Sequence, residues 1–321
     1  MQLKKLVNII ILIAVVIGAI TYAATNIPLT ASPAATILPS KTEQKPQFLF
    51  AFGNTGKSKL KKPIAMTVDE QGKIYVTDAG DSNIKIYSSN GKYIKGFGSK
   101  GTGKKDFAYP YGIAVLPNGD IVIADSVNLN VRVFTDNGKY KRTILDTKQK
   151  IKPGSLAVDD KGRIYISDLM NHQILVINSQ GKFIRKFRPA VSSLKYPQEV
   201  VFGQDAQELW VADSGNFAVK KINQKGLVTK TIREWGNPPQ SFSLVRGVGL
   251  DNLNRLMVAD TMNGTIHVMT QDGKDVFSFD GEDSPAGSLV YPSFILVDEH
   301  GKIYIIDRGF GIIQVWGYEK K

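Results

Sequence analysis

Carboxylates recur at a regular spacing in this sequence, and a carboxylate can hold a metal, move a proton or organise a turn. Six similar segments, whose ends lie 47, 43, 45, 47 and 47 residues apart, each end in an aspartate: Asp78, Asp125, Asp168, Asp213, Asp260 and Asp307. A short polar turn follows each one, and an aspartate in that place accepts hydrogen bonds from backbone N–H groups. Because this role explains one aspartate in every copy, we interpret all six as structural and predict no metal at them.

Histidine and cysteine, the other common metal ligands, are scarce. The chain has no cysteine and three histidines, His172, His267 and His300, which belong to three different copies of the repeat. A catalytic zinc normally has three protein ligands around one open position. The placement of the histidines therefore argues against a zinc enzyme.

Basic residues are in excess, and the formal net charge is +12 at pH 7. Lys61 and Lys62 precede the first copy of the repeat, and Lys104 and Lys105 precede the second, so both clusters occupy equivalent connections. A positive field attracts anions. We predict an anion-attracting face that carries these lysines; the alternative is that they only keep the surface soluble.

One aromatic segment departs from the repeat. Residues 235–242 (WGNPPQSF) have no close counterpart in the other copies, so we predict that Trp235 and Phe242 stack against a partner. Phe310 is a second candidate. Tyrosines that precede a proline recur from copy to copy, which indicates packing between copies instead: Tyr109, Tyr196 and Tyr291.

The repeat itself encodes β-strands. Residues 63–78 (PIAMTVDEQGKIYVTD) alternate apolar and polar residues on both sides of a turn, which predicts two strands joined as a hairpin. A third strand (84–87) and a fourth (93–97) follow the aspartate. A period of 43 to 47 residues with four strands is typical of one blade of a β-propeller.

The two ends of the repeat region complement each other. The last copy has three strands, which end within residues 311–317, whereas residues 48–52 (FLFAF) precede the first copy and resemble a fourth strand. Pairing these segments removes both exposed sheet edges. We therefore predict an all-β, six-bladed β-propeller of four-stranded antiparallel blades over residues 47–318, closed by strand 48–52.

The innermost strands of such a ring line its central channel. Tyr111, Gln198 and Arg246 lie at the second position of their strands, and Glu199 is the one carboxylate at the third position. Calcium usually takes six to eight oxygen ligands, so one acid is a poor calcium site. Tyr111 and Arg246 predict contact with a polar ligand. The alternative is a calcium- or zinc-dependent hydrolase or lyase that uses Gln198, Glu199 and Arg246.

The N-terminus predicts export. Lys4 and Lys5 precede 19 uncharged residues, close to the roughly 20 that span a bilayer. Residues 1–24 are therefore a signal-anchor helix or a cleaved signal peptide. Residues 25–46 are rich in Pro, Ala, Thr and Ser, as in an extended linker. We predict a propeller outside the cytoplasm, held at the membrane or secreted.

The turn before the third strand carries a recognisable pattern, Asp-x-x-Asn, in four copies: Asp125 with Asn128, Asp168 with Asn171, Asp213 with Asn216 and Asp260 with Asn263. The pattern resembles the NHL repeat family; Asp81 and Phe310 replace the asparagine in the other two copies. The family includes RNA binders, protein-binding domains of ubiquitin ligases, sensor domains of bacterial kinases and a zinc-dependent amidating lyase. The resemblance thus implies a fold but no single function.

Taken together, the residues predict a binding module without a catalytic residue, cofactor or metal. Its partner is a protein or an anionic cell-envelope polymer, since export argues against nucleic acid. The residues predicted to make contact are Lys61, Lys62, Lys104, Lys105, Tyr111, Arg246, Trp235 and Phe242.

Overall fold

The computed structural model describes residues 44–187, 194–203, 207–235 and 240–318. The predicted N-terminal segment, residues 1–24, and the predicted linker up to residue 43 lie outside these ranges. Within them, no helix is long and apolar enough to cross a membrane.

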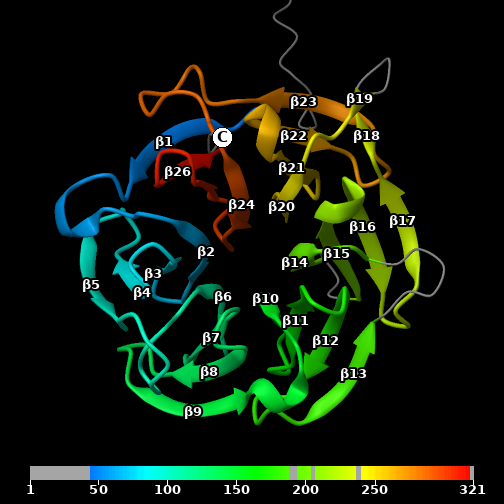
Figure 1. Ribbon diagram of the computed structural model, residues 1–321. Coiled ribbons are helices and arrows are strands. Elements are labelled where there is room, and N and C mark those ends of the chain that lie inside the picture. The colour runs from blue at the N-terminus through cyan, green and yellow to red at the C-terminus, as the bar shows by residue number, and fades with distance from the viewer. Residues whose placement is uncertain (1–43, 188–193, 204–206, 236–239, 319–321) are drawn as a thin grey trace, which may run out of the picture. The chain divides into compact units, whose positions relative to one another are not determined.

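Six four-stranded antiparallel sheets surround a central axis (Figure 1), which confirms the predicted six-bladed propeller. The strands of blades 1 to 3 are β2 (Pro63–Val68), β3 (Ile74–Asp78), β4 (Asn83–Tyr87) and β5 (Tyr93–Phe97); β6 (Pro110–Val115), β7 (Ile121–Asp125), β8 (Asn130–Phe134) and β9 (Tyr140–Leu145); β10 (Pro153–Val158), β11 (Ile164–Asp168), β12 (Gln173–Ile177) and β13 (Phe183–Phe187).

Blades 4 to 6 follow the same order from the axis outward. Their strands are β14 (Pro197–Phe202), β15 (Glu208–Asp213), β16 (Ala218–Asn223) and β17 (Val228–Ile232); β20 (Val245–Leu250), β21 (Leu256–Asp260), β22 (Thr265–Met269) and β23 (Asp275–Phe279); β24 (Pro292–Val297), β25 (Ile303–Asp307), β26 (Ile312–Gly317) and β1 (Gln47–Phe52).

Short elements lie in the connections between these strands. A two-stranded ribbon of β18 (Glu234–Trp235) and β19 (Gln240–Ser241) lies between blades 4 and 5. The single-turn 3₁₀ helices are η2 (Gly56–Ser58), η3 (Thr147–Gln149), η4 (Ser214–Asn216) and η5 (Thr261–Asn263).

Strand β1 closes the ring as predicted. It pairs with β26 in a register that runs from Gln47 opposite Gly317 to Phe52 opposite Ile313. The ring of Phe48 contacts that of Trp316 edge-on at 5.6 Å, and the ring of Phe52 lies 4.8 Å from that of Tyr87 in blade 1. The closing strand therefore completes blade 6 and also packs against blade 1.

The strands of every blade run between the two faces of the ring, so each face carries one set of turns. Each innermost strand starts opposite the aspartate that ends the second strand, as in the pair Pro63 and Asp78. We call this side the Asp face; it carries the turns after the six aspartates and the connections between blades. The other side carries the tight turns between strands 1 and 2 and between strands 3 and 4, and we call it the hairpin face.

A buried apolar residue anchors each connection between blades. In five of them it lies three residues before the innermost strand, and in blade 3 it lies two residues before: Leu60, Phe107, Ile151, Leu194, Phe242 and Leu289. These side chains fill the space between neighbouring blades, where no single blade has enough apolar surface for a core of its own. Phe242 is one of them and is therefore buried between blades 4 and 5.

Candidate functional site

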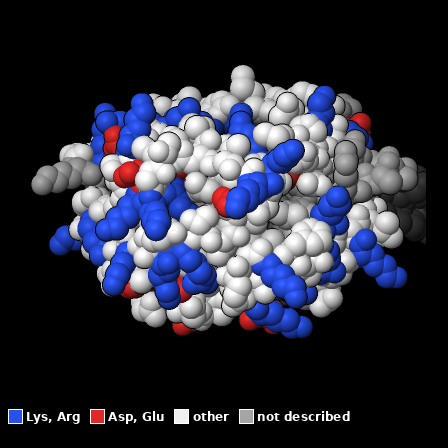
Figure 2. Space-filling view, turned by 60° about the horizontal axis from the view of Figure 1, so that its bottom comes forward, with Lys and Arg blue, Asp and Glu red and all other residues white. Residues whose placement is uncertain are grey.

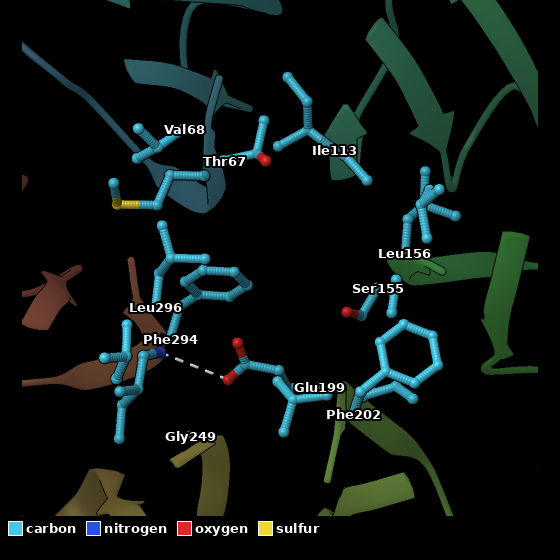
Figure 3. Close-up of a pocket in the computed structure, with 18 of the residues that line it drawn as sticks. Thr67, Val68, Ile113, Ser155, Leu156, Glu199, Phe202, Gly249, Phe294 and Leu296 are labelled. Atoms are coloured by element: carbon cyan, nitrogen blue, oxygen red, sulfur yellow. Dashed lines mark hydrogen bonds between the residues drawn. The ribbon is translucent and has the colours of Figure 1, made fainter. Parts of the chain in front are cut away.

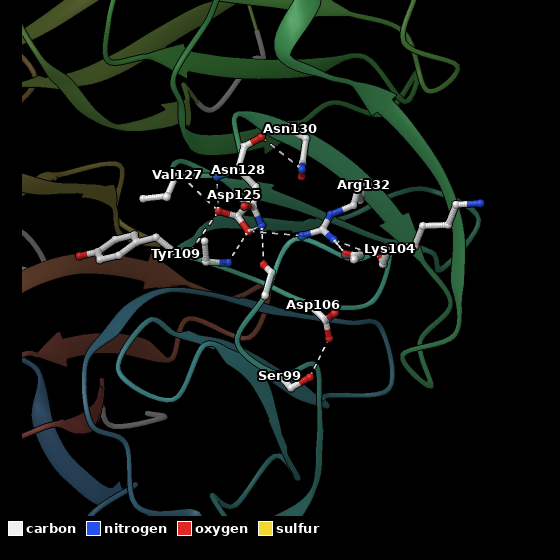
Figure 4. A network of polar contacts seen from close by, with 12 residues as sticks. Ser99, Lys104, Asp106, Tyr109, Asp125, Val127, Asn128, Asn130 and Arg132 are labelled. Carbon is white, nitrogen blue, oxygen red and sulfur yellow. Dashed lines mark hydrogen bonds and ion pairs between the residues drawn. The ribbon is translucent and has the colours of Figure 1, made fainter.

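The six repeated aspartates tie the blades to the connections that precede them. Asp125 accepts hydrogen bonds from the backbone N–H groups of Ala108 (2.8 Å) and Tyr109 (3.0 Å) and from the side chain of Asn128 (2.8 Å), as Figure 4 shows in part. Asp78, Asp168, Asp213, Asp260 and Asp307 accept equivalent backbone bonds. All six are 0% exposed. Their oxygens therefore serve the scaffold and line no open site.

In three blades, a buried cation on the third strand faces the carboxylate of the repeated aspartate. Lys85 Nζ lies 2.8 Å from Asp78 Oδ2, Arg132 Nη2 lies 3.3 Å from Asp125 Oδ2, and Lys220 Nζ lies 2.7 Å from Asp213 Oδ2. Burial of so many carboxylates leaves the surface more basic than the net charge suggests. In the view of Figure 2, Lys and Arg side chains greatly outnumber Asp and Glu.

A basic and aromatic pocket opens where the channel meets the Asp face. Its volume is about 350 Å³, and the described residues that line it include no carboxylate. The second residues of three innermost strands contribute to it, because alternate side chains of a strand point toward the axis. The residues that line it are Tyr109, Tyr111, Ser126, Val127, Lys152, Leu169, Tyr196, Gln198, Arg246 and Arg308. We call this pocket the mouth site.

Two arginines of the mouth site share one aromatic partner. The guanidinium carbons of Arg246 and Arg308 each lie 5.6 Å from the ring centroid of Tyr291. Arg246 Nε is buried and has no hydrogen-bond partner among the described residues. Neither arginine forms an ion pair with a carboxylate of the described chain. Two positive groups thus converge without a counter-charge.

The polar groups beside these arginines are oriented by each other. The hydroxyl of Tyr111 donates a hydrogen bond to Oε1 of Gln198, so the amide nitrogen of Gln198 remains a donor. Burial raises the pKa of Tyr111 to about 12 although Arg246 and Arg308 act to lower it. The phenol therefore stays protonated at neutral pH. The sequence places Tyr111, Gln198 and Arg246 at equivalent strand positions, and the structure brings all three together.

Seven residues that line the mouth site were not predicted as contacts, and four of them are basic or aromatic: Lys152, Tyr109, Tyr196 and Arg308. Aligning the repeats would have revealed Arg308, which directly follows Asp307. The equivalent residues are small or apolar: Ala79, Ser126, Leu169, Ser214 and Thr261. A long cation at a position where the other five blades carry small or apolar residues indicates a role at the mouth of the channel.

The predicted lysines do not gather in one place. Lys62 Nζ lies 5.0 Å from the ring centroid of Tyr109 and so borders the mouth site. Lys61 Nζ instead pairs with Asp81 at 2.5 Å. Lys104 Nζ lies 5.9 Å from the ring of Tyr140 on the outermost strand of blade 2, and Lys105 is exposed nearby in sequence. Of the four, Lys62 is the one that the contacts place beside the mouth.

The prediction for Phe242 is wrong. Its side chain is 3% exposed and packs against the ring of His267 at 5.6 Å, because it occupies the anchor position shared by Leu60 and Phe107. It cannot stack against a partner. The side chain of Trp235 and residues 236–239 lie outside the described part of the chain, so the prediction for Trp235 stands untested.

The channel below the mouth holds a second cavity, of about 380 Å³, lined largely by apolar side chains (Figure 3). Glu199 lies in its wall and accepts hydrogen bonds at Oε2 from the backbone N–H groups of Val248 (2.8 Å) and Ile295 (3.4 Å). Burial raises its pKa well above the usual range. Glu199 therefore connects the innermost strands of blades 4, 5 and 6.

The donor set of this channel does not fit a calcium or zinc ion. Among the described residues that line the cavity, Glu199 is the one carboxylate, and no histidine accompanies it. Across the described chain, no three His, Cys, Asp or Glu side chains are placed to hold a metal. Calcium requires several oxygen ligands and catalytic zinc about three protein ligands.

The fold and the mouth site define the protein as a six-bladed β-propeller with a basic opening. Residues 65–215 match the family described as SMP-30/Gluconolactonase/LRE-like region, over blades 1 to 3 and half of blade 4. A mouse relative, E3 ubiquitin-protein ligase TRIM32, is 34% identical over 124 residues, which are 33% of this chain and 19% of the ligase. The chain thus matches about a fifth of that relative's length.

Solved structures share the architecture at low identity. Virginiamycin B lyase from Staphylococcus aureus aligns with a TM-score of 0.60 and 19% identity over 86% of this chain and 88% of its own. A gluconolactonase from Xanthomonas campestris aligns with a TM-score of 0.62 and 14% identity over 81% of this chain and 87% of its own. At these identities the likeness shows the fold alone.

Proposed function

We propose that this protein is a binding module that holds an anionic group of its partner in the mouth site. The convergence of Arg246 and Arg308 on the ring of Tyr291 without a carboxylate carries this proposal. Two positive groups that face the same ring repel one another, and a buried N–H group without an acceptor, such as Arg246 Nε, is costly. An incoming carboxylate or phosphate relieves both effects, and arginine binds either group with two parallel hydrogen bonds.

The surroundings of the arginines support the same role. Lys62 and Lys152 add positive charge at the rim, and Gln198 and Tyr111 add polar contacts next to Arg246. The surface excess of lysine and arginine draws anions toward the molecule over longer distances. The arrangement contains donors for an anion and lacks an acid–base pair that would act on it.

The wider setting follows from the N-terminal sequence. The two lysines and the uncharged stretch within residues 1–24 support export, with the propeller anchored to the membrane or released from it. The Asp-x-x-Asn turns support an NHL-type repeat. In this reading the module acts outside the cytoplasm and binds a protein or an anionic cell-envelope polymer.

Substitution of the arginines tests the proposal. Binding of poly-L-glutamate to the purified full-length chain is measured by calorimetry at several salt concentrations. We expect Arg246→Ala and Arg308→Ala each to weaken binding by about tenfold or more, the scale of one lost charge-assisted hydrogen bond. Lys225→Ala, an exposed lysine in a turn of the hairpin face, is the control. Equal losses in all three variants would mean that only the overall charge matters.

A metal-dependent hydrolase or lyase is the second candidate. Its support is the partial match to the SMP-30/Gluconolactonase/LRE-like family and the buried Glu199 in the channel. The poor donor set described above opposes it. Elemental analysis of the protein, purified without chelator, decides between the two: one calcium or zinc per chain, lost on Glu199→Gln, would favour the enzyme over the binding module.

A further inference from the structure

Large apolar side chains are unusually exposed around the mouth site. Of the twelve that are exposed in the described chain, seven lie in the turns and connections of the Asp face, with exposures of 50 to 64%: Val127, Met170, Tyr196, Phe217, Met262, Val290 and Phe310. We call these seven residues the apolar rim. The other five lie on outermost strands or in a turn of the hairpin face.

Three of the rim residues occupy one equivalent place in the repeat. Val127, Met170 and Met262 are each the second residue after a repeated aspartate, where the polypeptide turns toward the third strand. The equivalent residues in the other blades are glycines, which shows that the turn itself needs no side chain there: Gly80, Gly215 and Gly309. The apolar side chains therefore contribute little to the turn, and their exposure calls for another explanation.

Two rim residues also line the mouth site. Val127 and Tyr196 belong to its wall together with Arg246 and Arg308. Tyr196 has a φ angle of 52°, in the left-handed region that bulky residues seldom adopt, and its ring contacts that of His172 at 4.6 Å. This backbone holds a half-exposed aromatic ring beside the arginines. The apolar rim and the basic centre are thus parts of one surface.

We infer that this surface docks a protein which inserts an acidic side chain into the mouth site and covers the apolar rim with apolar side chains. The inference rests on the proposed anion-binding function and names its partner. Tyr, Arg, Met and Phe, which this surface exposes, are enriched at protein interfaces, and contacts that surround a central arginine strengthen its binding by excluding water from it. An anionic polysaccharide supplies carboxylates to the two arginines but leaves the side chains of the apolar rim exposed to water.

Two synthetic polymers separate charge from apolar contact. Poly-L-glutamate supplies carboxylates alone, and a random copolymer of glutamate and tyrosine supplies carboxylates with aromatic side chains. Alginate, a polymer of uronic acids, represents the polysaccharide. Affinities for the full-length chain are compared at one salt concentration. We expect the copolymer to bind at least tenfold more tightly than either of the purely charged polymers.

A rim variant provides the decisive comparison. The triple change Met170→Ser, Met262→Ser and Phe310→Ser removes apolar surface from three blades without touching the arginines. We expect it to abolish the preference for the copolymer and to leave poly-L-glutamate binding unchanged. The matched control, Ile94→Ser with Phe183→Ser on the outermost strands β5 and β13, removes side chains that are exposed to a similar degree and should keep the preference.

The outcomes separate this inference from the function on which it rests. Two results overturn the protein-docking inference alone. In the first, binding requires Arg246 and Arg308 but shows no preference for the copolymer. In the second, the preference for the copolymer survives in the rim variant. Tighter binding of alginate overturns that inference too and identifies a polysaccharide partner. Absence of any arginine-dependent binding overturns the anion-binding function itself.

Discussion

Lys220 Nζ lies 2.7 Å from Asp213 Oδ2 inside blade 4, and neither side chain exposes more than 1% of its surface. The same geometry recurs with Lys85 in blade 1 and Arg132 in blade 2. Asp213 also accepts a backbone hydrogen bond from Lys195. The pair therefore joins the third strand of a blade to the connection that enters it, and its charges have no access to water.

Removing the cation of this pair should destabilise the fold strongly. Lys220→Met keeps a long apolar stem but leaves the carboxylate of Asp213 buried without its counter-charge. Breaking a buried pair in this way costs about 3–5 kcal/mol. Urea unfolding followed by tryptophan fluorescence measures the loss, with Lys225→Met, an exposed residue, as the control that should change stability by less than about 0.5 kcal/mol. A loss below about 1 kcal/mol would show that the other hydrogen bonds of Asp213 suffice to stabilise its buried carboxylate.

The buried Glu199 predicts a pH dependence of stability. Because burial raises its pKa in the folded protein, the folded state binds this proton more tightly than the unfolded state. The resulting stability is fully present below the unfolded-state pKa of about 4.3 and is lost as the pH rises through the folded-state pKa.

Glu199→Gln tests this dependence, since the amide retains an oxygen for the N–H of Val248. We expect the variant to gain stability relative to the native protein as the pH rises, by about 1.4 kcal/mol per pH unit within the affected window. Unfolding by urea at pH 4, 6 and 8 measures the difference. Glu70→Gln, on an exposed turn, should show none of it. A difference that stays constant with pH would contradict the raised pKa.

The corrected position of Phe242 gives a direct comparison with Phe310. Phe242→Ala should cost about 3–5 kcal/mol, because it opens a cavity at the anchor between blades 4 and 5. Phe310→Ala should change stability by less than about 0.5 kcal/mol, because its ring is 55% exposed. Thermal and urea unfolding of both variants measure the contrast. Similar losses in the two proteins would place the ring of Phe310 in a packed environment.

The closing strand β1 should contribute as much to the free energy of unfolding as a core strand does. Phe52→Ala removes a buried ring that packs against Tyr87, and we expect a loss of about 3–5 kcal/mol. Leu49→Ala in the same strand is the matched control, because that side chain points largely into solvent. If the two variants unfold alike, β1 is held by its backbone hydrogen bonds rather than by its side chains.

The architecture could be predicted closely from the sequence, because the blades of a propeller appear as repeats of similar length and pattern. The recurring strand pair with its aspartate defines the blade, and the apolar segment before the first copy predicted the closure now seen between β1 and β26. The predicted strand, 48–52, differs from the observed Gln47–Phe52 by one residue. Tyr111, Gln198 and Arg246 lie together in the structure, as their shared place at the second position of an innermost strand implies; their contact with a ligand stays a prediction.

Side chains on connections were harder to predict, for two physical reasons. The anchor role of Phe242 is hidden in the sequence, because the connection before blade 5 is long and the following strand begins with Val245 instead of proline. Lys61 and Lys104 belong to clusters of like charge in the sequence, yet a long lysine side chain can extend in several directions. In the structure Lys61 pairs with Asp81, and Lys104 lies over the ring of Tyr140. Arg308 is difficult to predict because it lies in a turn, where an exposed arginine is common and indicates no contact by itself.

The pairing of Phe52 with Ile313 has a consequence for how the chain acquires its structure. Blades 1 to 5 are each made from consecutive residues, so their strands can pair as soon as they are synthesised. Blade 6 needs the first strand of the propeller and the last three, which brings together the most distant segments in the described chain. Such contacts carry the largest loop-closure entropy and form slowly. Until β26 emerges, the ring stays open with two unpaired edges, and we expect this interval to be the period in which the chain is most exposed to aggregation and proteolysis.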